Sequence, residues 1–450
     1  MSTNTPREGS LGAPTRHPLD WRSESFYDFN AIDMEMERVF DICHGCRRCF
    51  NLCESFPRLF DLVDASPTGE LDGVAKDDYK AVVDACTLCD MCFMTKCPYV
   101  PPHEWALDFP HLMLRYRAAE LKRDGPGRAH ELTKTDRNGQ LARSVAPLAN
   151  FASERGNWVT RPLMKAALGV DAGVELPKYH TNTFSRRAAL EPPRVNPDGK
   201  ARARKAVLYA TCFVDYNQPS TGVAAQAVLA HQGVETEAVY PACCGMPQLE
   251  QGDIVGVARR AEQISAALLP YVDAGYDIIT LTASCGLMFK FEWPLILPEH
   301  EGVKRLAAAT RDICEYVVDI AKTEGLTGEL IPIEGGVTAH MACHARAQNM
   351  GRKSAELLKL IPDTRVDVVE RCSGHGGTFG VMAETRALAV KIGRPAARQV
   401  AQKRNNTLCS DCPLACKHLG QLVSDEMLEI GPAPGVRAHP IEIFARAYGF

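Results

Sequence analysis

Apolar residues recur at helical spacing soon after the start of the chain. They follow an i, i+4, i+7, i+8 pattern at Ile32, Met36, Val39 and Phe40. A second apolar group, residues 81–83, predicts another helix over about residues 76–86. Residues 1–30 lack such a pattern and begin with a polar, Pro-containing stretch. We therefore expect a flexible tail over 1–30, followed by a helical domain over 31–119.

From residue 206 onward, short apolar runs alternate with longer amphipathic segments. Three runs predict buried strands, at 206–211, 236–240 and 277–282, and the segments 222–231 and 254–274 predict helices. The same order returns with strands at 337–342, 365–369 and 407–408 and with helices at 354–361 and 384–403. We therefore expect two tandem α/β copies, over 206–335 and 336–450. The predicted fold class is α+β and multidomain, with a helical domain before the α/β repeats.

The stretch between these two parts differs from the rest of the chain in charge. Residues 120–205 hold 17 Lys and Arg against 9 Asp and Glu, whereas the whole chain of 450 residues has a net charge of −4. Such a basic connector is either an ordinary solvated segment with short helices or a docking surface for an acidic redox partner or anionic lipid head groups. The overall charge does not favour nucleic-acid binding.

The chain shows no targeting or membrane-spanning pattern. Its first residues lack the apolar core of a secretory signal, and no run of about 18 apolar residues occurs. We expect a cytoplasmic protein without a transmembrane segment, which only a partner would hold at the inner face of the membrane. In a reducing compartment, cysteines serve metal or redox chemistry rather than disulfides.

The eighteen cysteines fall into two groups. Eight lie between Cys43 and Cys97, none lies in residues 98–211, and ten lie between Cys212 and Cys416. The first group forms two C-x2-C-x2-C triplets, each followed by a fourth cysteine. In two-cluster ferredoxins, the fourth cysteine of each run binds the other cluster. This spacing predicts two [4Fe-4S] clusters, one on Cys43, Cys46, Cys49 and Cys97 and the other on Cys86, Cys89, Cys92 and Cys53.

Two details of these triplets depart from the usual pattern. Cys53 is followed by Glu54 instead of Pro, and Cys92 and Cys97 are one residue farther apart than usual. Structural zinc is the competing interpretation, but zinc sites use cysteine pairs separated by a gap. The helical pattern around the triplets favours an α-helical ferredoxin domain.

The second group of cysteines resembles a longer motif, C-x31–38-C-C-G-x35–40-C-x-x-C. This is the cysteine-rich CCG domain of heterodisulfide reductases, which also occurs in the C subunit of anaerobic glycerol-3-phosphate dehydrogenase and in lactate- and glycolate-oxidation proteins. The resemblance covers residues 206–445, and a helical ferredoxin domain followed by CCG repeats is typical of the family. The chain is identified as a member of its heterodisulfide reductase-related branch.

The motif can be placed residue by residue. In the first copy it falls on Cys212, Cys243, Cys244, Gly245 and Cys285, with Thr282 in the first position of the closing pair. In the second copy it falls on Cys343, Cys372, Gly374, Cys409 and Cys412, with Ser373 in place of a CCG cysteine. Each copy therefore keeps four of the five motif cysteines.

The missing cysteine bears on the chemistry that the resemblance implies. In heterodisulfide reductases, five cysteines are implied in a noncubane cluster that cleaves a disulfide. Four thiolates suit an ordinary [4Fe-4S] cluster or tetrahedral zinc, and a site without metal also stays open. His340, His344 and His375 are hydrogen-bonding or proton-carrying candidates, or else ordinary structural histidines. Cys416 is a replacement ligand or a core residue, and Cys314 is interpreted as core.

These patterns together predict an iron–sulfur electron-transfer protein or oxidoreductase subunit. It would relay electrons between the two ferredoxin-type clusters and the CCG sites. No dinucleotide-binding or P-loop motif occurs, and no catalytic residue is assigned. We therefore expect a redox partner in a hetero-oligomer: a flavoprotein dehydrogenase, a rubrerythrin-like protein or a quinone-linked complex. The alternatives are a disulfide reductase acting at the CCG sites and a zinc-stabilised interaction protein.

Overall fold

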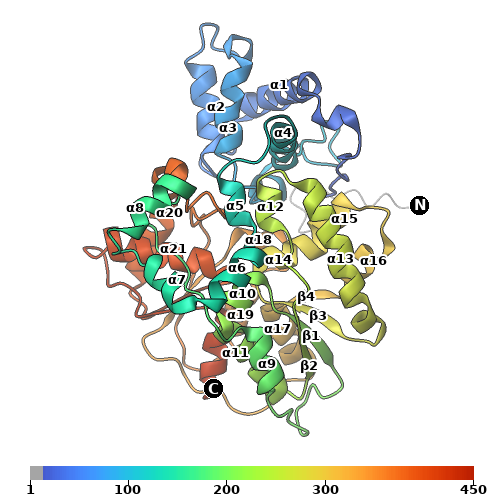
Figure 1. The fold of residues 1–450 in the computed structure, drawn as a ribbon, viewed down its shortest axis with the longest axis vertical. Coiled ribbons are helices and arrows are strands. Elements are labelled where there is room, and N and C mark those ends of the chain that lie inside the picture. The colour runs from blue at the N-terminus through green and yellow to red at the C-terminus, as the bar shows by residue number, and fades with distance from the viewer. Residues whose placement is uncertain (1–13) are drawn as a thin grey trace.

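A helical N-terminal part lies at one end of the molecule, and two parallel β-sheets lie toward the other end (Figure 1). The structure is a computed structural model that describes residues 14–450. The first thirteen residues of the predicted tail lie outside the described residues. The order of a helical region followed by two α/β units agrees with the predicted fold class.

Four helices build the N-terminal part: α1 (Phe29–Cys46), α2 (Ser55–Asp64), α3 (Tyr79–Asp84) and α4 (Phe109–Asp124). The Asp28 side chain caps α1 by accepting a hydrogen bond from the backbone N–H of Asn30. The predicted apolar face of α1, from Ile32 to Phe40, is buried. The helix expected over 76–86 is also present, as a 3-10 turn at Lys76–Asp78 that leads into α3.

Residues 14–30 differ from the predicted tail, because they are fixed to the rest of the molecule. Arg16, whose side chain is only 10% exposed, forms ion pairs with Asp90, Asp108 and Glu292 at 3.0, 2.7 and 3.2 Å. The indole N–H of Trp21 donates a hydrogen bond to the carbonyl of Ile296 at 2.8 Å. Apolar periodicity does not reveal such anchoring, since it rests on one buried charge with distant partners.

Short helices occupy the basic connector: α5 (Ala129–Thr133), α6 (Thr135–Ser144), α7 (Ala146–Ala152), α8 (Thr160–Leu168) and α9 (Phe184–Leu190). Large apolar side chains of residues 141–168 are exposed, at Leu141, Val145, Leu148, Phe151, Trp158, Val159, Leu163 and Leu168. We call these eight side chains the exposed apolar stretch. Large exposed apolar patches on soluble proteins mark interaction sites, so this stretch is a candidate interaction surface.

The first α/β unit holds a parallel sheet in the order β2-β1-β3-β4. Its strands are β1 (Lys205–Tyr209), β2 (Glu235–Val239), β3 (Asp277–Thr280) and β4 (Thr310–Asp312). Its helices are α10 (Cys212–Tyr216), α11 (Pro219–His231), α12 (Met246–Glu250), α13 (Ile254–Asp273), α14 (Ala283–Leu287), α15 (Trp293–Ile296), α16 (Glu301–Ala309) and α17 (Ile313–Thr323). The three predicted strands are confirmed, and β4 is an addition.

The second unit repeats this topology, with the sheet order β6-β5-β7-β8. Its strands are β5 (Val337–His340), β6 (Val366–Val369), β7 (Thr407–Ser410) and β8 (Val436–Ala438). Its helices are α18 (Cys343–Ala347), α19 (Lys353–Leu358), α20 (Ala383–Lys403), α21 (Pro413–Glu426) and α22 (Pro440–Ala447). The predicted internal repeat is therefore present in the fold.

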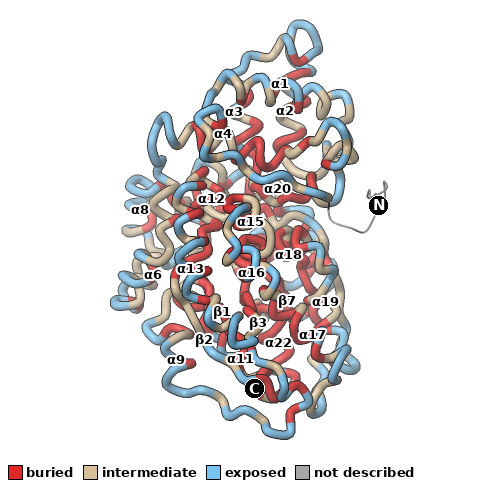
Figure 2. The backbone as a smooth tube through the Cα atoms, turned by 90° about the vertical axis from the view of Figure 1, so that its right-hand side faces the viewer, coloured by how far each residue is buried: buried red, intermediate tan, exposed pale blue. Residues whose placement is uncertain are grey.

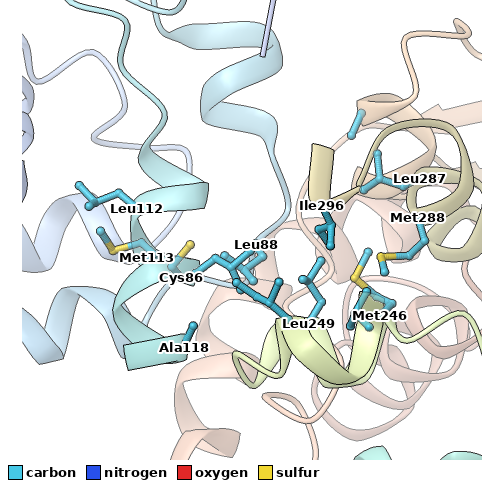
Figure 3. Close-up of a cluster of buried hydrophobic side chains, with 14 of the residues drawn as sticks. Cys86, Leu88, Leu112, Met113, Ala118, Met246, Leu249, Leu287, Met288 and Ile296 are labelled. Atoms are coloured by element: carbon cyan, nitrogen blue, oxygen red, sulfur yellow. The ribbon is translucent and has the colours of Figure 1, made fainter. Parts of the chain in front are cut away.

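Two shared hydrophobic cores join the three parts of the molecule. One core runs from α1–α4 into the first unit, and the other joins the first unit to the second. Figure 2 shows buried segments that continue from the helical end into the sheets. Figure 3 shows the first junction, where Leu88, Leu112 and Met113 lie on one side and Met246 and Leu249 on the other. The parts are therefore held against one another by apolar contact.

Candidate functional site

A cavity of about 680 Å³ lies where the N-terminal part meets both α/β units. Cysteines of all three parts line it: Cys53 and Cys89, then Cys212, Cys243, Cys244 and Cys285, then Cys343, Cys372 and Cys412. The sequence singled out every one of these cysteines, but it did not predict that they share one cavity.

The topology of the sheets explains why the cysteines of the two units meet. Cys212 follows β1 and Cys343 follows β5, and both strands are central in parallel sheets. The carboxyl ends of parallel strands lie at the same edge of a sheet, which is where ligands bind in open α/β folds. Each unit thus presents its cysteine loops to the cavity at that edge.

The first N-terminal set comes together at the end of α1. Burial and the neighbouring thiols of Cys97, Cys49 and Cys46 raise the pKa of Cys43 well above its usual value. Burial, Cys97 and Cys46 likewise raise the pKa of Cys49 to about 12. The structure therefore brings together the four cysteines that the sequence assigned to one cluster.

Two cysteines of the second N-terminal set, Cys53 and Cys89, line the cavity. Burial and the thiol of Cys86 raise the pKa of Cys53 to about 12. Cys92 has a pKa raised by burial and by the thiols of Cys89, Cys53 and Cys86. Cys53 thus lies near thiols of the triplet that follows it in sequence.

The same set also reaches the second α/β unit. Burial first, and then the thiols of Cys343, Cys53 and Cys372, raise the pKa of Cys89 well above its usual value. The thiol of Cys372 also contributes to the raised pKa of Cys53. The thiols of the N-terminal part and those of the second unit are therefore electrostatic neighbours.

The four thiols of the first unit form two close pairs. The Sγ atoms of Cys212 and Cys243 are 3.6 Å apart, and those of Cys244 and Cys285 are 3.2 Å apart. Hydrogen bonds with Cys212 and Cys244 lower the pKa of Cys243 well below its usual value, whereas the pKa of Cys212 is raised, first by its hydrogen bond with Cys243. These distances exceed a disulfide bond of about 2.05 Å. The set is therefore a group of free thiols.

In the second unit, three thiols reach the cavity and one does not. Burial and the thiols of Cys372 and Cys412 raise the pKa of Cys343. The backbone N–H of Gly374 donates a hydrogen bond to Cys372 Sγ at 3.4 Å. Cys409 instead lies within β7, is fully buried and is absent from the cavity wall.

Strand register gives the reason for the position of Cys409. In the first sheet Tyr209 pairs with Thr280, and in the second sheet His340 pairs with Ser410. Ser410 is therefore the counterpart of Thr280. One residue earlier, Cys409 corresponds to Ile279 within the strand, and two residues later, Cys412 corresponds to Thr282. Cys412 therefore takes the first position of the closing pair, and the last position of that pair falls on Ala415.

The spacing in the sequence held a signal for this register. Thirty-four residues separate Gly374 from Cys409, whereas thirty-seven separate Gly374 from Cys412. Only the second spacing falls within the 35 to 40 residues of the motif. The second unit thus has three cavity thiols, and the first unit has four.

The cysteine sets fit an iron–sulfur cluster better than a single ion. All cysteines of the described chain are free thiols. Across residues 14–450, no group of three or more His, Cys, Asp or Glu side chains converges closely enough to hold one metal ion. A cubane cluster needs no such convergence, since each thiolate binds a different iron. Its positive iron also compensates thiolates that burial would otherwise disfavour.

The histidines singled out by the sequence have different surroundings. His340 has two partners at 2.9 Å, the Ser410 hydroxyl and the Arg371 carbonyl, so it is a satisfied structural residue. His344 lines the cavity and also has two partners, the Ser284 hydroxyl and the Leu88 carbonyl. His375 lines the cavity with its buried Nε2 unpartnered.

The two remaining cysteines lie in the core. Cys416 is buried and its thiol lies 3.5 Å from the Leu408 carbonyl. Cys314 is buried on α17, as expected. Neither lines the cavity.

Glu250 is a cavity residue that the sequence analysis missed. It is buried, and burial raises its pKa to about 7. Its Oε2 has no hydrogen-bond partner and lies against Gly377, where a Cβ atom would clash with it. A lone Glu six residues after Cys244 carries no recognisable motif, so only the packing of the two units reveals it.

The fold and the cysteine pattern define a protein with two tandem CCG cysteine-rich domains. The family model of this cysteine-rich domain matches residues 206–290 and 337–418, one match in each α/β unit. The chain belongs to this family of CCG cysteine-rich domain proteins.

Named relatives fall within the same family. The chain is 27% identical over 323 residues to the C subunit of anaerobic glycerol-3-phosphate dehydrogenase from Escherichia coli strain K12, covering 70% of this chain and 76% of the relative. It is 32% identical over 192 residues to lactate utilization protein A of Geobacillus kaustophilus, covering 39% of this chain and 74% of the relative. The alignment with the first relative, over 323 residues, is longer than the two domain matches together, so the similarity is not confined to the matched segments. Within residues 14–450, no helix is both long and apolar enough to cross a membrane.

Proposed function

We propose that this chain is an iron–sulfur electron-transfer subunit of an oxidoreductase. Its N-terminal part would hold two [4Fe-4S] clusters, on Cys43, Cys46, Cys49 and Cys97 and on Cys86, Cys89, Cys92 and Cys53. The convergence of these two sets supports the assignment, since each interleaved fourth cysteine lies among the thiols of its proposed partners.

The proposed sites of the CCG domains are the cavity thiols. The first repeat would use Cys212, Cys243, Cys244 and Cys285, and the second would use Cys343, Cys372 and Cys412. Cys409 is left out of the proposed set because it lies inside β7. A cluster bound in these domains supplies one-electron redox chemistry, and the protein supplies ligands, burial and hydrogen bonds.

One observation carries the electron-transfer proposal: thiols of the N-terminal part and of both CCG repeats line one cavity. Cys53 and Cys89 lie at the wall that faces Cys343 and Cys372. Electrons would therefore pass from the N-terminal sets to the CCG sites across this shared cavity. The outer set, at Cys43, is the proposed entry or exit for a partner.

A hetero-oligomeric assembly is part of the proposal. The relative in Escherichia coli is named as a subunit of a dehydrogenase, and this chain shows no dinucleotide-binding motif of its own. The partner would be a flavoprotein dehydrogenase, a rubrerythrin-like protein or a quinone-linked complex, and the chain would act on the cytoplasmic side of the membrane.

A second candidate function, substrate reduction at the CCG sites, is favoured by the cavity itself. Its volume of about 680 Å³ is in the range of small-molecule sites. A disulfide substrate would sit among the thiols of both repeats. The first repeat has four of the five motif cysteines and the second has only three in the cavity, which speaks for electron relay as the main function.

The experiment is an anaerobic redox titration of the purified chain, followed by electron paramagnetic resonance. We expect signals of at least two interacting [4Fe-4S] clusters, and a further signal that Cys372→Ser alters while leaving the N-terminal signals in place. A small disulfide that changes the Cys372-dependent signal would favour the reductase. Zinc bound in place of iron would contradict both functions.

A further inference from the structure

A second cavity, of about 730 Å³, lies on the far side of the Cys243 loop. Its walls come from the connector helices α5 and α6 and, in the first repeat, from α10, α12, α13 and the loop after β2. Figure 1 shows α5 and α6 beside α12 and α10. None of its lining residues is a cysteine, so it is separate from the site described above.

Two arginines of this cavity are not held by an ion pair within residues 14–450. Arg143 and Arg259 line it, and neither forms an ion pair or a side-chain hydrogen bond with the residues from 14 to 450. The Nε atom of Arg143 is buried without a partner. A buried guanidinium donor that is left unpaired is costly, and an anionic oxygen is its best acceptor.

The carboxylates of the cavity are already engaged. Asp136 pairs with Arg260 at 2.8 Å, and Asp253 caps α13. Asp215 accepts a hydrogen bond from the backbone N–H of Ser185 at 2.7 Å, and burial raises its pKa despite the nearby arginine. The wall also holds four cationic side chains, those of Lys134, Arg143, Arg259 and Arg260, against these three carboxylates, so its net charge is positive.

The cavity also offers a buried acceptor. Gln248 is buried, and its Nε2 donates to the Thr133 carbonyl at 2.8 Å, which fixes the orientation of the amide. Its Oε1 then has no partner. His130 contributes a buried Nδ1 that is unpartnered as well. A hydroxyl group of a ligand would satisfy the amide oxygen.

We propose that this cavity is a binding site for a small organic anion that carries hydroxyl groups. Arg143 and Arg259 hold its phosphate or carboxylate, and Gln248 accepts a hydrogen bond from a hydroxyl. The aromatic rings of Tyr216 and Tyr240 form part of the wall. Phosphate monoesters and hydroxycarboxylates share this chemistry.

The site is linked to the cysteine loop by direct hydrogen bonds. Asp136 accepts hydrogen bonds from the Tyr240 hydroxyl and from the backbone N–H of Cys243. Arg260 donates to the Cys243 carbonyl at 3.3 Å. Asp136 and Arg260, which both line the cavity, therefore connect its wall directly to the loop that carries the Cys243 thiol.

Calorimetric titration of the anaerobic full chain tests the site, with glycerol 2-phosphate and glycerate as probes. We expect saturable binding of at least one probe, and a loss of about tenfold or more in affinity for each of Arg143→Gln and Arg259→Gln. Arg394→Gln is the matched control, because it removes an exposed arginine that pairs with Glu426 in the second repeat. It should bind as the parent chain does.

Two outcomes would overturn the proposal: no saturable binding of either probe, or affinities that Arg143→Gln and Arg259→Gln leave unchanged. Inorganic phosphate that binds as tightly as glycerol 2-phosphate would overturn the role of Gln248. Iron content is measured on the same samples. A failure of binding with iron in place rejects this site alone, whereas missing iron rejects the proposed electron-transfer function.

Discussion

Burial is the main influence on the pKa of the thiols that the second repeat presents to the cavity. It is the main cause that raises the pKa of Cys372, Cys343 and Cys412, in the last case to about 11. Buried thiolates side by side repel one another and need a positive charge between them. A metal cluster provides that charge, so the thiols and the cluster stabilise each other.

Replacing Cys412 by alanine should affect metal binding, whereas replacing Cys409 by alanine should affect stability. Cys412→Ala removes a cavity thiol, so we expect loss or alteration of the metal signal of the second repeat. Cys409→Ala leaves a small void beside β7 in the protein core. We expect it to lower the free energy of unfolding by about 1 kcal/mol or more and to leave the metal content unchanged. Metal analysis and thermal unfolding of the two variants distinguish these effects. Equal loss of metal in both would restore Cys409 as a ligand.

The interleaved assignment predicts which double variants lose more iron. Cys53→Ser should disable the cluster of the Cys86 triplet, so adding Cys89→Ser costs no further iron. Adding Cys46→Ser instead disables the other cluster and removes most of what remains of the N-terminal iron. Iron analysis of the two double variants decides the matter, with Cys314→Ser as a core control. The opposite order would mean that each run holds its own cluster.

At the scale of elements, apolar runs decided which strands the sequence could predict. Residues 207–209 are all apolar or aromatic, as is typical of a buried strand, and the structure confirms a buried strand there. Two of the four edge strands, β4 and β8, were missed because each is only three residues long and contains an arginine, Arg311 in β4 and Arg437 in β8. Such strands form because a neighbouring strand offers hydrogen bonds, which a linear pattern does not show.

The exposed apolar stretch should control the solubility of the isolated chain. Trp158 is 86% exposed, Phe151 68% and Leu148 66%. Replacing the three with serine removes apolar surface from water, so we expect weaker binding of a hydrophobic dye and less self-association, with unchanged iron. Light scattering and dye fluorescence measure both.

A matched control uses exposed apolar residues outside that stretch. Leu190, Val195 and Ile331 are exposed at other places, and their replacement by serine should change both readouts far less. An equal effect of the two triple variants would mean that the stretch has no special role as an interaction surface.

At the scale of the whole molecule, one buried ion cluster joins three segments of the chain. Arg16 lies near the N-terminus, Asp90 lies between two cysteines of the second triplet, and Glu292 belongs to the first repeat. Burial alone would raise the pKa of Asp108. The charges of Arg16 and His111 outweigh burial and lower this pKa to about 2, so Asp108 stays a carboxylate. The cluster fixes the cysteine loop against the first repeat.

Arg16→Met should therefore destabilise the molecule strongly. It leaves buried carboxylates without their counter-charge, and such a loss costs about 3–5 kcal/mol. Arg38→Met is the control, because Arg38 pairs with Glu35 at the surface, where a pair contributes about 0–1 kcal/mol. Anaerobic thermal unfolding compares them. Equal midpoints for the two variants would show that the ion cluster has no structural weight.

The candidate site could be predicted in its parts but not as a whole. Triplet spacing was enough to propose Cys43 and Cys86 as ligands, because the cysteines of each triplet lie close together in sequence. The shared cavity depends on how the N-terminal part docks on both repeats, through contacts such as Leu88 with Leu249. Residues that matter only after docking, such as Glu250, therefore had no signal in the sequence.

The most direct test of the account is anaerobic analysis of iron, acid-labile sulfide and zinc in the freshly purified chain. We predict about eight irons with matching sulfide from the N-terminal part, further iron from the CCG repeats, and no stoichiometric zinc. The further iron should fall in Cys412→Ala, which leaves the N-terminal eight in place. Little iron together with stoichiometric zinc would contradict the account, and the cysteines would then be structural.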